Sequence, residues 1–146
     1  MNRDRVQEQL AIDEGVVYEV YLDHLGYATF GIGHLVLDTD PEHGCDIGTA
    51  VSEERVTEAF QKDLDISISE CKVLYDLWDD YPGEVQEILV NMMFNLGRPR
   101  LSGFKNFKKA VDAGDWAKAG IEGRDSKWHK QVGNRAERLM VRMENV

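Results

Sequence analysis

The sequence predicts an α+β fold with a small β-hairpin lobe near the N-terminus and a larger helical lobe at the C-terminus. Residues 16–32 are rich in β-branched and aromatic residues, and turn residues at 23–26 interrupt them as in a hairpin. Residues 84–96 are too apolar for a surface helix, so they predict a buried helix at the centre of the helical lobe. A cleft between two such lobes is a common place for a ligand.

A first helix is expected from Arg3 to Asp13. Gly15 is suited to end this helix, because glycine accepts the left-handed conformation without steric cost. The apolar side of the helix would be formed by Val6, Leu10 and Ile12.

Three short strands follow the first helix in the prediction. They are expected at residues 16–22, 27–32 and 34–36, and a polar loop is expected at 38–50. Ser52 is a typical N-cap residue for the next helix, which should run past Cys71.

The rest of the chain is predicted to be helical. The expected helices lie at residues 75–79, 84–96, 104–113, 115–122 and 134–144. Gly97 would end the central helix, and Gly114, Gly123 and Gly133 would separate the later ones.

The 146 residues contain no internal repeat and no linker, so a single domain is expected over residues 1–146. The N-terminal lobe would comprise residues 14–52, and residues 53–72 would form a connecting helix. The helical lobe would comprise residues 73–146 together with the helix at 3–13.

The net charge of −10 is unevenly distributed along the chain. Residues 1–90 contain 21 acidic and 5 basic side chains, whereas residues 91–146 contain 6 acidic and 12 basic ones. A basic C-terminal part can attract an anionic polymer, such as a nucleic acid or the bacterial cell wall. It is equally compatible with an ordinary solvated surface.

The two cysteines and the N-terminal residues predict a protein of a reducing cytoplasm. Cys45 and Cys71 form no C-x-x-C motif, so free thiols and no metal site are expected. The first residues contain no apolar stretch, so no signal peptide is expected. No apolar run is long enough for a membrane span.

Glu14 and Asp23 are the first candidates for chemistry. One would lie at the end of the first helix and the other in the hairpin turn, nine positions later. Glycoside hydrolysis needs two such carboxyl groups, one to protonate the leaving oxygen and one to activate water or attack directly. Because the chain contains 27 acidic residues, spacing alone does not separate this pair from surface charges.

The residues around this pair form a longer pattern. Asp-Glu-Gly at 13–15, Tyr-x-Asp-x-x-Gly at 21–26 and Thr-x-Gly-x-Gly-His at 29–34 together resemble the active-site signature of the phage-type lysozyme family. The resemblance covers nearly the whole chain. It continues, in the same order, at residues 60–63, 91–97, 103–106, 126–128 and 134–138.

The resemblance implies roles for three residues at the reacting centre. Glu14 would be the general acid, and Asp23 would assist a water on the opposite face of the sugar, with inversion at the anomeric carbon. Thr29 would hold that water, since a hydroxyl can both donate and accept a hydrogen bond.

Other matching residues would support the site. His34 would form a salt bridge with Asp63, and Arg135 would pair with Glu14 and orient it, so these three residues are interpreted as structural. Leu35 and Phe94 match positions that line the saccharide cleft, although ordinary core packing explains them equally well. Trp128 is expected in the core.

The resemblance also shows departures from the family at three places. Phe107 replaces a hydroxyl-bearing residue and Glu122 replaces an amide, both at positions of the cleft. The stretch from His34 to Asp63 is shorter than in the family, so the loop at 38–50 would replace a short helix. These changes concern the sugar and peptide-stem subsites rather than the acid and the base.

The function implied by the resemblance is that of an endolysin-type muramidase with a lysozyme-like α+β fold. It would hydrolyse the β-1,4 bond between N-acetylmuramic acid and N-acetylglucosamine in bacterial peptidoglycan, without a cofactor, for host cell lysis. We expect a monomer that binds neither nucleic acid nor, stably, a membrane. It would remain in the host cytoplasm until another protein gives it access to the cell wall.

Three alternatives remain at this point. The chain could be a lysozyme domain used in a phage tail during entry, or a non-catalytic wall-binding or tail structural module. The basic C-terminal part also allows a nucleic-acid-binding helical protein, although no motif of that class is present.

Overall fold

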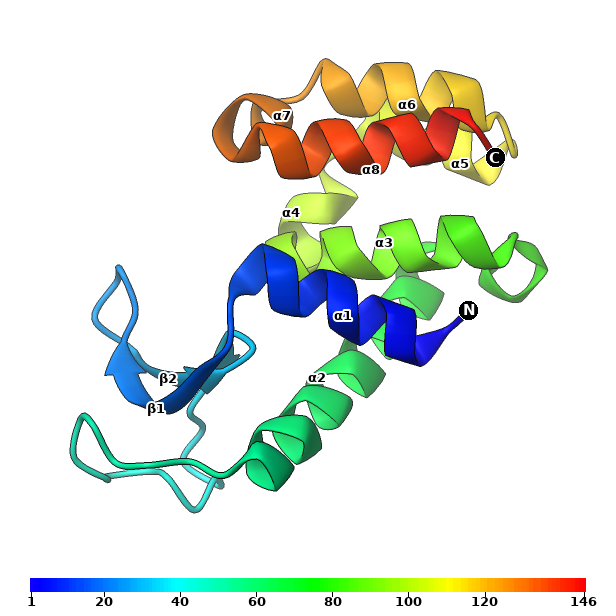
Figure 1. The fold of residues 1–146 in the computed structure, drawn as a ribbon. Coiled ribbons are helices and arrows are strands. Elements are labelled where there is room, and N and C mark those ends of the chain that lie inside the picture. Colours follow the sequence, from blue (N-terminus) through cyan, green and yellow to red (C-terminus); the bar gives the residue numbers. More distant parts are fainter. The chain divides into compact units, whose positions relative to one another are not determined.

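The computed structural model describes all 146 residues as eight α-helices, one short 3-10 helix and a three-stranded antiparallel sheet (Figure 1). The predicted α+β class is confirmed. The chain divides into two compact units, which are described separately. The N-terminal unit is Asp4–Asp65, and the C-terminal unit is Met1–Arg3 with Ile66–Val146. The assignment of the whole chain to one domain stays a prediction.

The N-terminal unit contains a helix, the sheet, a long loop and the first part of a second helix. Its elements are α1 (Arg3–Glu14), β1 (Val17–Leu22), β2 (Ala28–Gly31), β3 (His34–Leu35) and the beginning of α2 (Glu53–Leu74). The strands follow the order β1-β2-β3. All three predicted strands are present, each shorter than expected.

Helix α1 ends at Glu14, one residue later than predicted, and Gly15 follows it as expected. Gly15 has a φ of 79° and donates from its backbone N–H to Ala11 O at 2.9 Å. Val6 and Leu10 are buried as expected, but Ile12 is 71% exposed. The placement of Ile12 on the apolar side was wrong, because a residue two positions after Leu10 lies on the opposite side of a helix.

The sheet separates a core face from a second face. Val20 on β1 and Phe30 on β2 are fully buried. Tyr21 and Thr29 are directly paired across the two strands, so their side chains lie on the other face. In the turn between the strands, Gly26 has a φ of 85°.

The loop after β3 contains no helix, as predicted for residues 38–50. It returns to the sheet, where Gly48 donates to Val20 O and Val51 donates to Tyr18 O. The loop then leads into α2, whose N-cap is Ser52, because the Ser52 hydroxyl accepts from Arg55 N at 3.1 Å. This cap is also as predicted.

The C-terminal unit consists of helices around the buried α3. Its elements are the rest of α2, a 3-10 helix (Trp78–Asp80), α3 (Gly83–Leu96), α4 (Arg98–Ser102), α5 (Lys105–Asp112), α6 (Trp116–Arg124), α7 (Lys127–Val132) and α8 (Asn134–Glu144). Nine residues of α3 are buried, including the polar Glu87 and Asn91. The prediction of a buried central helix is confirmed.

Three details of the helical prediction were wrong. The expected helix at 75–79 is only the 3-10 turn Trp78–Asp80, because the backbone bonds there run from i+3 to i. The short helices α4 and α7 were not predicted. Gly123 lies inside α6 instead of ending a helix.

The position of Gly123 has a packing reason. Helices α6 and α8 lie side by side in the C-terminal unit (Figure 1). A side-chain carbon at Gly123 would overlap Met140 Sδ on α8, so the glycine allows the two backbones to approach closely.

No helix is both long and apolar enough to cross a membrane.

Candidate active site

Glu14 is the last residue of α1, and its carboxylate lies against the turn that follows β2. A side-chain carbon at Gly33 would lie 3.4 Å from Glu14 Oε2. Gly33 has a φ of 63°, which favours glycine on conformational grounds as well. The end of α1 and the end of β2 therefore meet at this carboxylate.

Asp23 has one carboxylate oxygen tied to the hairpin turn. Its Oδ1 accepts hydrogen bonds from the backbone N–H groups of Leu25 and Tyr27, both at 2.9 Å. Its own N–H donates to Tyr27 O at 2.9 Å. The turn thus fixes the orientation of the carboxylate and leaves Oδ2 as the oxygen that can act on a ligand.

Thr29 lies on β2 and is 4% exposed. Its hydroxyl donates to Tyr27 O at 3.0 Å. Since the hydroxyl hydrogen is used in this bond, the oxygen lone pairs remain to accept a hydrogen bond from water.

Tyr21 links these residues, although the sequence patterns assigned it no role. Partial burial raises the pKa of Tyr21, and the negative charges of Asp23 and Glu14 raise it further. Its phenol therefore lies within the electrostatic reach of both carboxylates. The signal in the sequence was the Tyr-x-Asp spacing, which places Tyr21 and Asp23 on one side of a strand.

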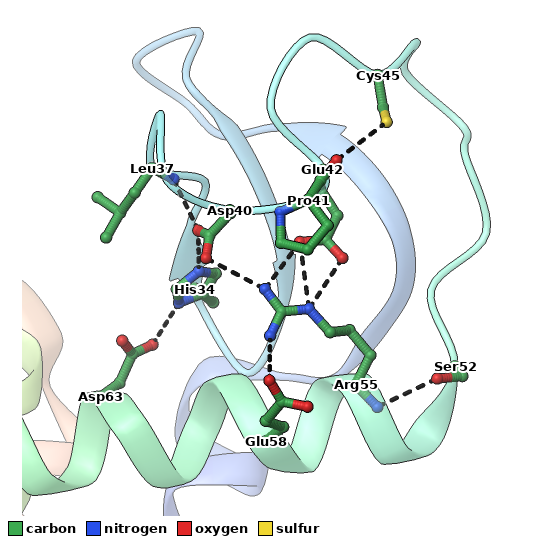
Figure 2. A network of polar contacts seen from close by, with 10 residues as sticks. All are labelled: His34, Leu37, Asp40, Pro41, Glu42, Cys45, Ser52, Arg55, Glu58 and Asp63. Carbon is green, nitrogen blue, oxygen red and sulfur yellow. Dashed lines mark hydrogen bonds and ion pairs between the residues drawn. The ribbon is translucent and has the colours of Figure 1, made fainter.

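His34 joins the long loop to α2 through two carboxylates (Figure 2). Its Nδ1 lies 2.7 Å from Asp63 Oδ2, and its Nε2 lies 2.7 Å from Asp40 Oδ2. Burial opposes the charged imidazole, but the hydrogen bonds and charges of Asp63 and Asp40 outweigh it and raise the pKa of His34. Both nitrogens can donate at once only in the protonated ring.

Arg55 on α2 completes this network (Figure 2). Its guanidinium binds Glu42 through Nε and a terminal nitrogen, both at 2.9 Å, and reaches Asp40 Oδ1 at 3.1 Å. It also contacts Glu58 at 3.1 Å and lies 5.5 Å from the ring centre of Phe30. The hydrogen bond from Arg55 lowers the pKa of Glu42. Neither Asp40 nor Arg55 was predicted from the sequence.

Arg135 lies in the C-terminal unit, whereas Glu14 lies in the N-terminal unit. Arg135 Nε donates to Asn91 Oδ1 at 3.0 Å. Its expected pairing with Glu14 stays a prediction.

Leu35 and Phe94 also belong to different units. Leu35 is 47% exposed and Phe94 is half-buried. Their shared contribution to a saccharide cleft stays a prediction. Trp128 is buried and donates from Nε1 to Asn95 Oδ1 at 2.8 Å.

Phe107 and Glu122 line one pocket of about 290 Å³ in the C-terminal unit. Phe107 is 2% exposed, so its ring packs into the core. The pocket also contains two basic and one further acidic residue, namely Lys105, Lys127 and Asp125.

No cluster of three or more His, Cys, Asp or Glu side chains has a geometry that could hold a metal ion. Both cysteines are free thiols, with Cys45 exposed and Cys71 buried.

Comparison with known proteins identifies relatives along the whole chain. The family model described as phage lysozyme matches residues 11–145. The chain is 28% identical to the probable T4-type lysozyme 2 of Dictyostelium discoideum, over 92% of this chain and 91% of that protein.

Two longer phage proteins are also similar. The chain is 32% identical to the pre-baseplate central spike protein Gp5 of Enterobacteria phage T4, over 92% of this chain and 26% of that protein. It is 30% identical to the peptidoglycan hydrolase gp36 of Pseudomonas phage phiKMV, over 94% of this chain and 15% of that protein. The chain thus spans about a quarter of the spike protein and less of the hydrolase.

Proposed function

Because the chain belongs to the phage lysozyme family, we propose that it is a muramidase that hydrolyses bacterial peptidoglycan. The bond cleaved would be the β-1,4 bond between N-acetylmuramic acid and N-acetylglucosamine. The observation that carries the proposal is geometric: the Glu14 carboxylate lies against the turn after β2, and the hairpin turn holds Asp23 by Oδ1 while leaving its Oδ2 unused. Relatives named as lysozymes and as a peptidoglycan hydrolase support the same substrate.

Glu14 is proposed as the general acid. Its carboxyl group donates a proton to the glycosidic oxygen while the bond from that oxygen to the anomeric carbon breaks. The proposed task of Arg135 is to orient this carboxyl group.

Asp23 and Thr29 are proposed to hold the attacking water. One hydrogen of the water points to Thr29 Oγ1, which can accept because its own hydrogen is bound to Tyr27 O. The other points to Asp23 Oδ2, the carboxylate oxygen that the hairpin turn leaves unused. A lone pair of the water then attacks the anomeric carbon as its proton moves to Asp23, and the configuration inverts.

The side chains of Leu35 and Phe94 are proposed to contact the saccharide. Leu35 leaves a large part of its side chain exposed on β3. Aliphatic and aromatic side chains commonly line the walls of ligand sites, whereas a few polar groups fix the orientation of the ligand.

The biological setting proposed first is that of an endolysin, which releases phage progeny by degrading the host cell wall. A second candidate is a domain of a tail spike that opens the wall during entry. The similarity to a quarter of a central spike protein favours this second setting. Detection of the protein in purified virions by mass spectrometry would distinguish entry from lysis.

The test of the enzymatic proposal is the clearing of chloroform-treated Gram-negative cells by wild type and by Glu14→Gln. We expect Glu14→Gln to lose at least about 100-fold of the clearing rate, as for the loss of a general acid. Glu8→Gln, an exposed residue of the same helix, is the matched control and should clear at the wild-type rate. Equal clearing by wild type and Glu14→Gln would reject the assigned acid.

A wild type that binds cell walls but clears no cells would instead identify a wall-binding module. The stereochemistry is tested by proton NMR of the anomeric region during hydrolysis. An α-anomer formed first supports inversion, and a β-anomer formed first rejects it.

A further inference from the structure

The register of the sheet places two rows of side chains on the face that carries Thr29. In the first row, Thr29 on β2 is paired with Tyr21 on β1 and with Leu35 on β3. Directly paired side chains lie on the same face, with Cβ atoms about 4.5–5.5 Å apart. This row therefore crosses the whole three-stranded sheet.

The second row lies next to the first, toward the hairpin turn. Asp23 N donates to Tyr27 O, which extends the pairing of β1 with β2 by one position. Val36 N likewise donates to Ala28 O and extends the pairing of β2 with β3, so Leu37 comes beside Tyr27. Because residues two positions apart share one face of a strand, Asp23, Tyr27 and Leu37 lie on the same face as the first row.

Three members of these rows are apolar or aromatic side chains that the protein leaves uncovered. Tyr27 is 58% exposed, and Leu35 and Leu37 are each 47% exposed. The core of the unit lies on the opposite face of the sheet, where Val20 and Phe30 are fully buried. The three side chains thus form a patch on the outer face, and neighbouring apolar groups with a few polar ones are typical of ligand sites.

The patch borders both groups that are proposed to hold the attacking water. Tyr27 lies between Asp23 and Leu37 in its row, and it precedes Thr29 by two positions along the chain. A spacing of two residues along a strand is about 6.6 Å. A glycan that presents its anomeric carbon to this water therefore passes next to the ring of Tyr27.

The rings of a β-1,4-linked glycan have the chemistry that fits this surface. Hydroxyl and acetamido groups surround the edge of each pyranose ring, whereas C–H groups cover its two faces. An aromatic ring offers such a face a large, flat contact, and its negative π-face attracts the slightly positive C–H groups. The hydroxyl at the tip of a tyrosine can remain in water while the ring makes this contact.

We propose that Tyr27 is a substrate-contacting residue, whose ring stacks on a pyranose ring of the glycan next to the bond that is cleaved. Leu37 borders this contact on the side away from Asp23. The inference rests on the proposed muramidase function and deepens it, because it names the surface that positions the glycan over Asp23 and Thr29. Tyr27 binds the sugar and takes no part in proton transfer.

The kinetic test compares Tyr27→Ala with Tyr27→Phe on soluble peptidoglycan fragments. Both variants keep the hydrogen bonds between Tyr27 and the residues Asp23 and Thr29, because these bonds use backbone atoms of Tyr27. Tyr27→Ala removes the ring, so we expect KM to rise about five- to tenfold while kcat stays within about twofold. Tyr27→Phe loses only the hydroxyl and should stay within about twofold of wild type in both constants. An equal loss in both variants would assign the effect to the hydroxyl and reject stacking.

Tyr18→Ala is the matched control. Tyr18 is another tyrosine of the hairpin, it lies on β1, and it is 48% exposed. Its side chain lines a different pocket, together with residues of α1 and α2. The variant should therefore keep the KM and kcat of wild type.

A second measurement needs neither turnover nor a truncated side chain. Glu14→Gln with 13Cε-labelled tyrosine is titrated with a tetrasaccharide of alternating N-acetylglucosamine and N-acetylmuramic acid, and NMR follows the tyrosine rings. The Tyr27 resonances are assigned by their absence after the additional substitution Tyr27→Phe. They should shift in a saturable way, whereas the Tyr18 resonances should not shift.

The outcomes separate this inference from the function on which it rests. A wild type that hydrolyses no peptidoglycan, in a protein whose Tyr27 resonances still shift with the tetrasaccharide, would reject the muramidase and retain the glycan surface. An active wild type would overturn the role of Tyr27 alone if Tyr27→Ala had an unchanged KM or if the Tyr27 resonances stayed unmoved above the wild-type KM. The absence of both hydrolysis and shifts would overturn both.

Discussion

At the scale of single residues, Asp23 divides its two carboxylate oxygens. Oδ1 accepts two backbone N–H groups of the hairpin turn, which holds the side chain in place. The same turn carries the carbonyl of Tyr27, to which Thr29 donates its hydroxyl hydrogen. Backbone atoms of the hairpin thus orient both proposed water-binding groups, Asp23 and Thr29.

This division predicts different results for two substitutions of Asp23. Asp23→Asn keeps an oxygen for the turn, so its melting temperature should stay near wild type. Asp23→Ala leaves the two N–H groups without this acceptor and should lose about 1 kcal/mol of unfolding free energy. Both should lose about 100-fold or more in activity. Calorimetry and cell clearing measure the two effects, and full activity of Asp23→Asn would exclude it as the base.

At the scale of elements, the long loop is held to α2 by an imidazole and a guanidinium. His34 and Arg55 share Asp40, and they reach Asp63, Glu42 and Glu58 separately. The loop thereby gains fixed contacts without forming a helix of its own. Partly buried pairs of this kind are screened less by salt than exposed ones.

The network predicts a dependence of stability on pH. Because the pKa of His34 is raised, its contribution to the free energy of unfolding is complete below about pH 6.5. This contribution is lost as the pH rises through the raised pKa. Burial opposes the charge on Asp40, but hydrogen bonds from Leu37 N and His34 outweigh it and lower the pKa of Asp40. Its contribution to the free energy of unfolding is therefore complete above about pH 3.8 and is lost as the pH falls through the lowered value. The network should therefore be strongest between these two values.

The measurement is the melting temperature as a function of pH for wild type and Asp40→Asn. Removal of one carboxylate should shift the alkaline loss of stability to lower pH, because His34 would hold its proton less strongly. His24→Gln, an exposed position of the hairpin turn, serves as the control. An identical pH dependence in wild type and Asp40→Asn would contradict this role of the network.

The contact between α6 and α8 predicts that substitution by alanine changes the stability differently at two glycines of α6. Alanine favours a helix by about 1 kcal/mol over glycine. At Gly123 an added methyl group overlaps the buried Met140, and overpacking costs about 1–3 kcal/mol. At Gly120 it meets the side chain of Glu144, the half-buried last residue of α8, which can turn toward solvent with the loss only of its partly exposed ion pair with Arg124. Chemical denaturation should show Gly123→Ala to be less stable than Gly120→Ala, and the reverse order would refute this packing.

At the scale of the whole molecule, the charge distribution predicts a salt dependence. The net charge of −10 opposes binding to an anionic cell wall, and salt screens this repulsion. The clearing rate should therefore rise from low salt to about 0.5 M, where the Debye length is only a few ångströms. A steady fall of the clearing rate over this range would show that attraction by the basic C-terminal part dominates.

Local patterns predicted much of the N-terminal unit. Gly15, the hairpin and the Ser52 cap follow from backbone preferences that act within a few residues. The same kind of signal placed Glu14 at a helix end and Asp23 in a turn.

Features that depend on distant residues could not be predicted in this way. Gly123 was interpreted as a helix end. Its actual role depends on a contact with Met140 on another helix, which local patterns do not reveal. Arg55 binds a loop that precedes it by 13 to 15 positions, in a chain with many acidic residues and therefore many possible partners. The pairing of Tyr21 with Thr29 likewise depends on the register between two strands, which local patterns do not specify.

The most direct test of the muramidase proposal is the identity of the new chain ends in digested peptidoglycan. Purified peptidoglycan is incubated with wild type or Glu14→Gln, reduced with borohydride and analysed by mass spectrometry. We predict reduced N-acetylmuramic acid at the new ends with wild type and none above background with Glu14→Gln. New ends at N-acetylglucosamine, cleaved peptide stems, or equal products from both proteins would contradict the account.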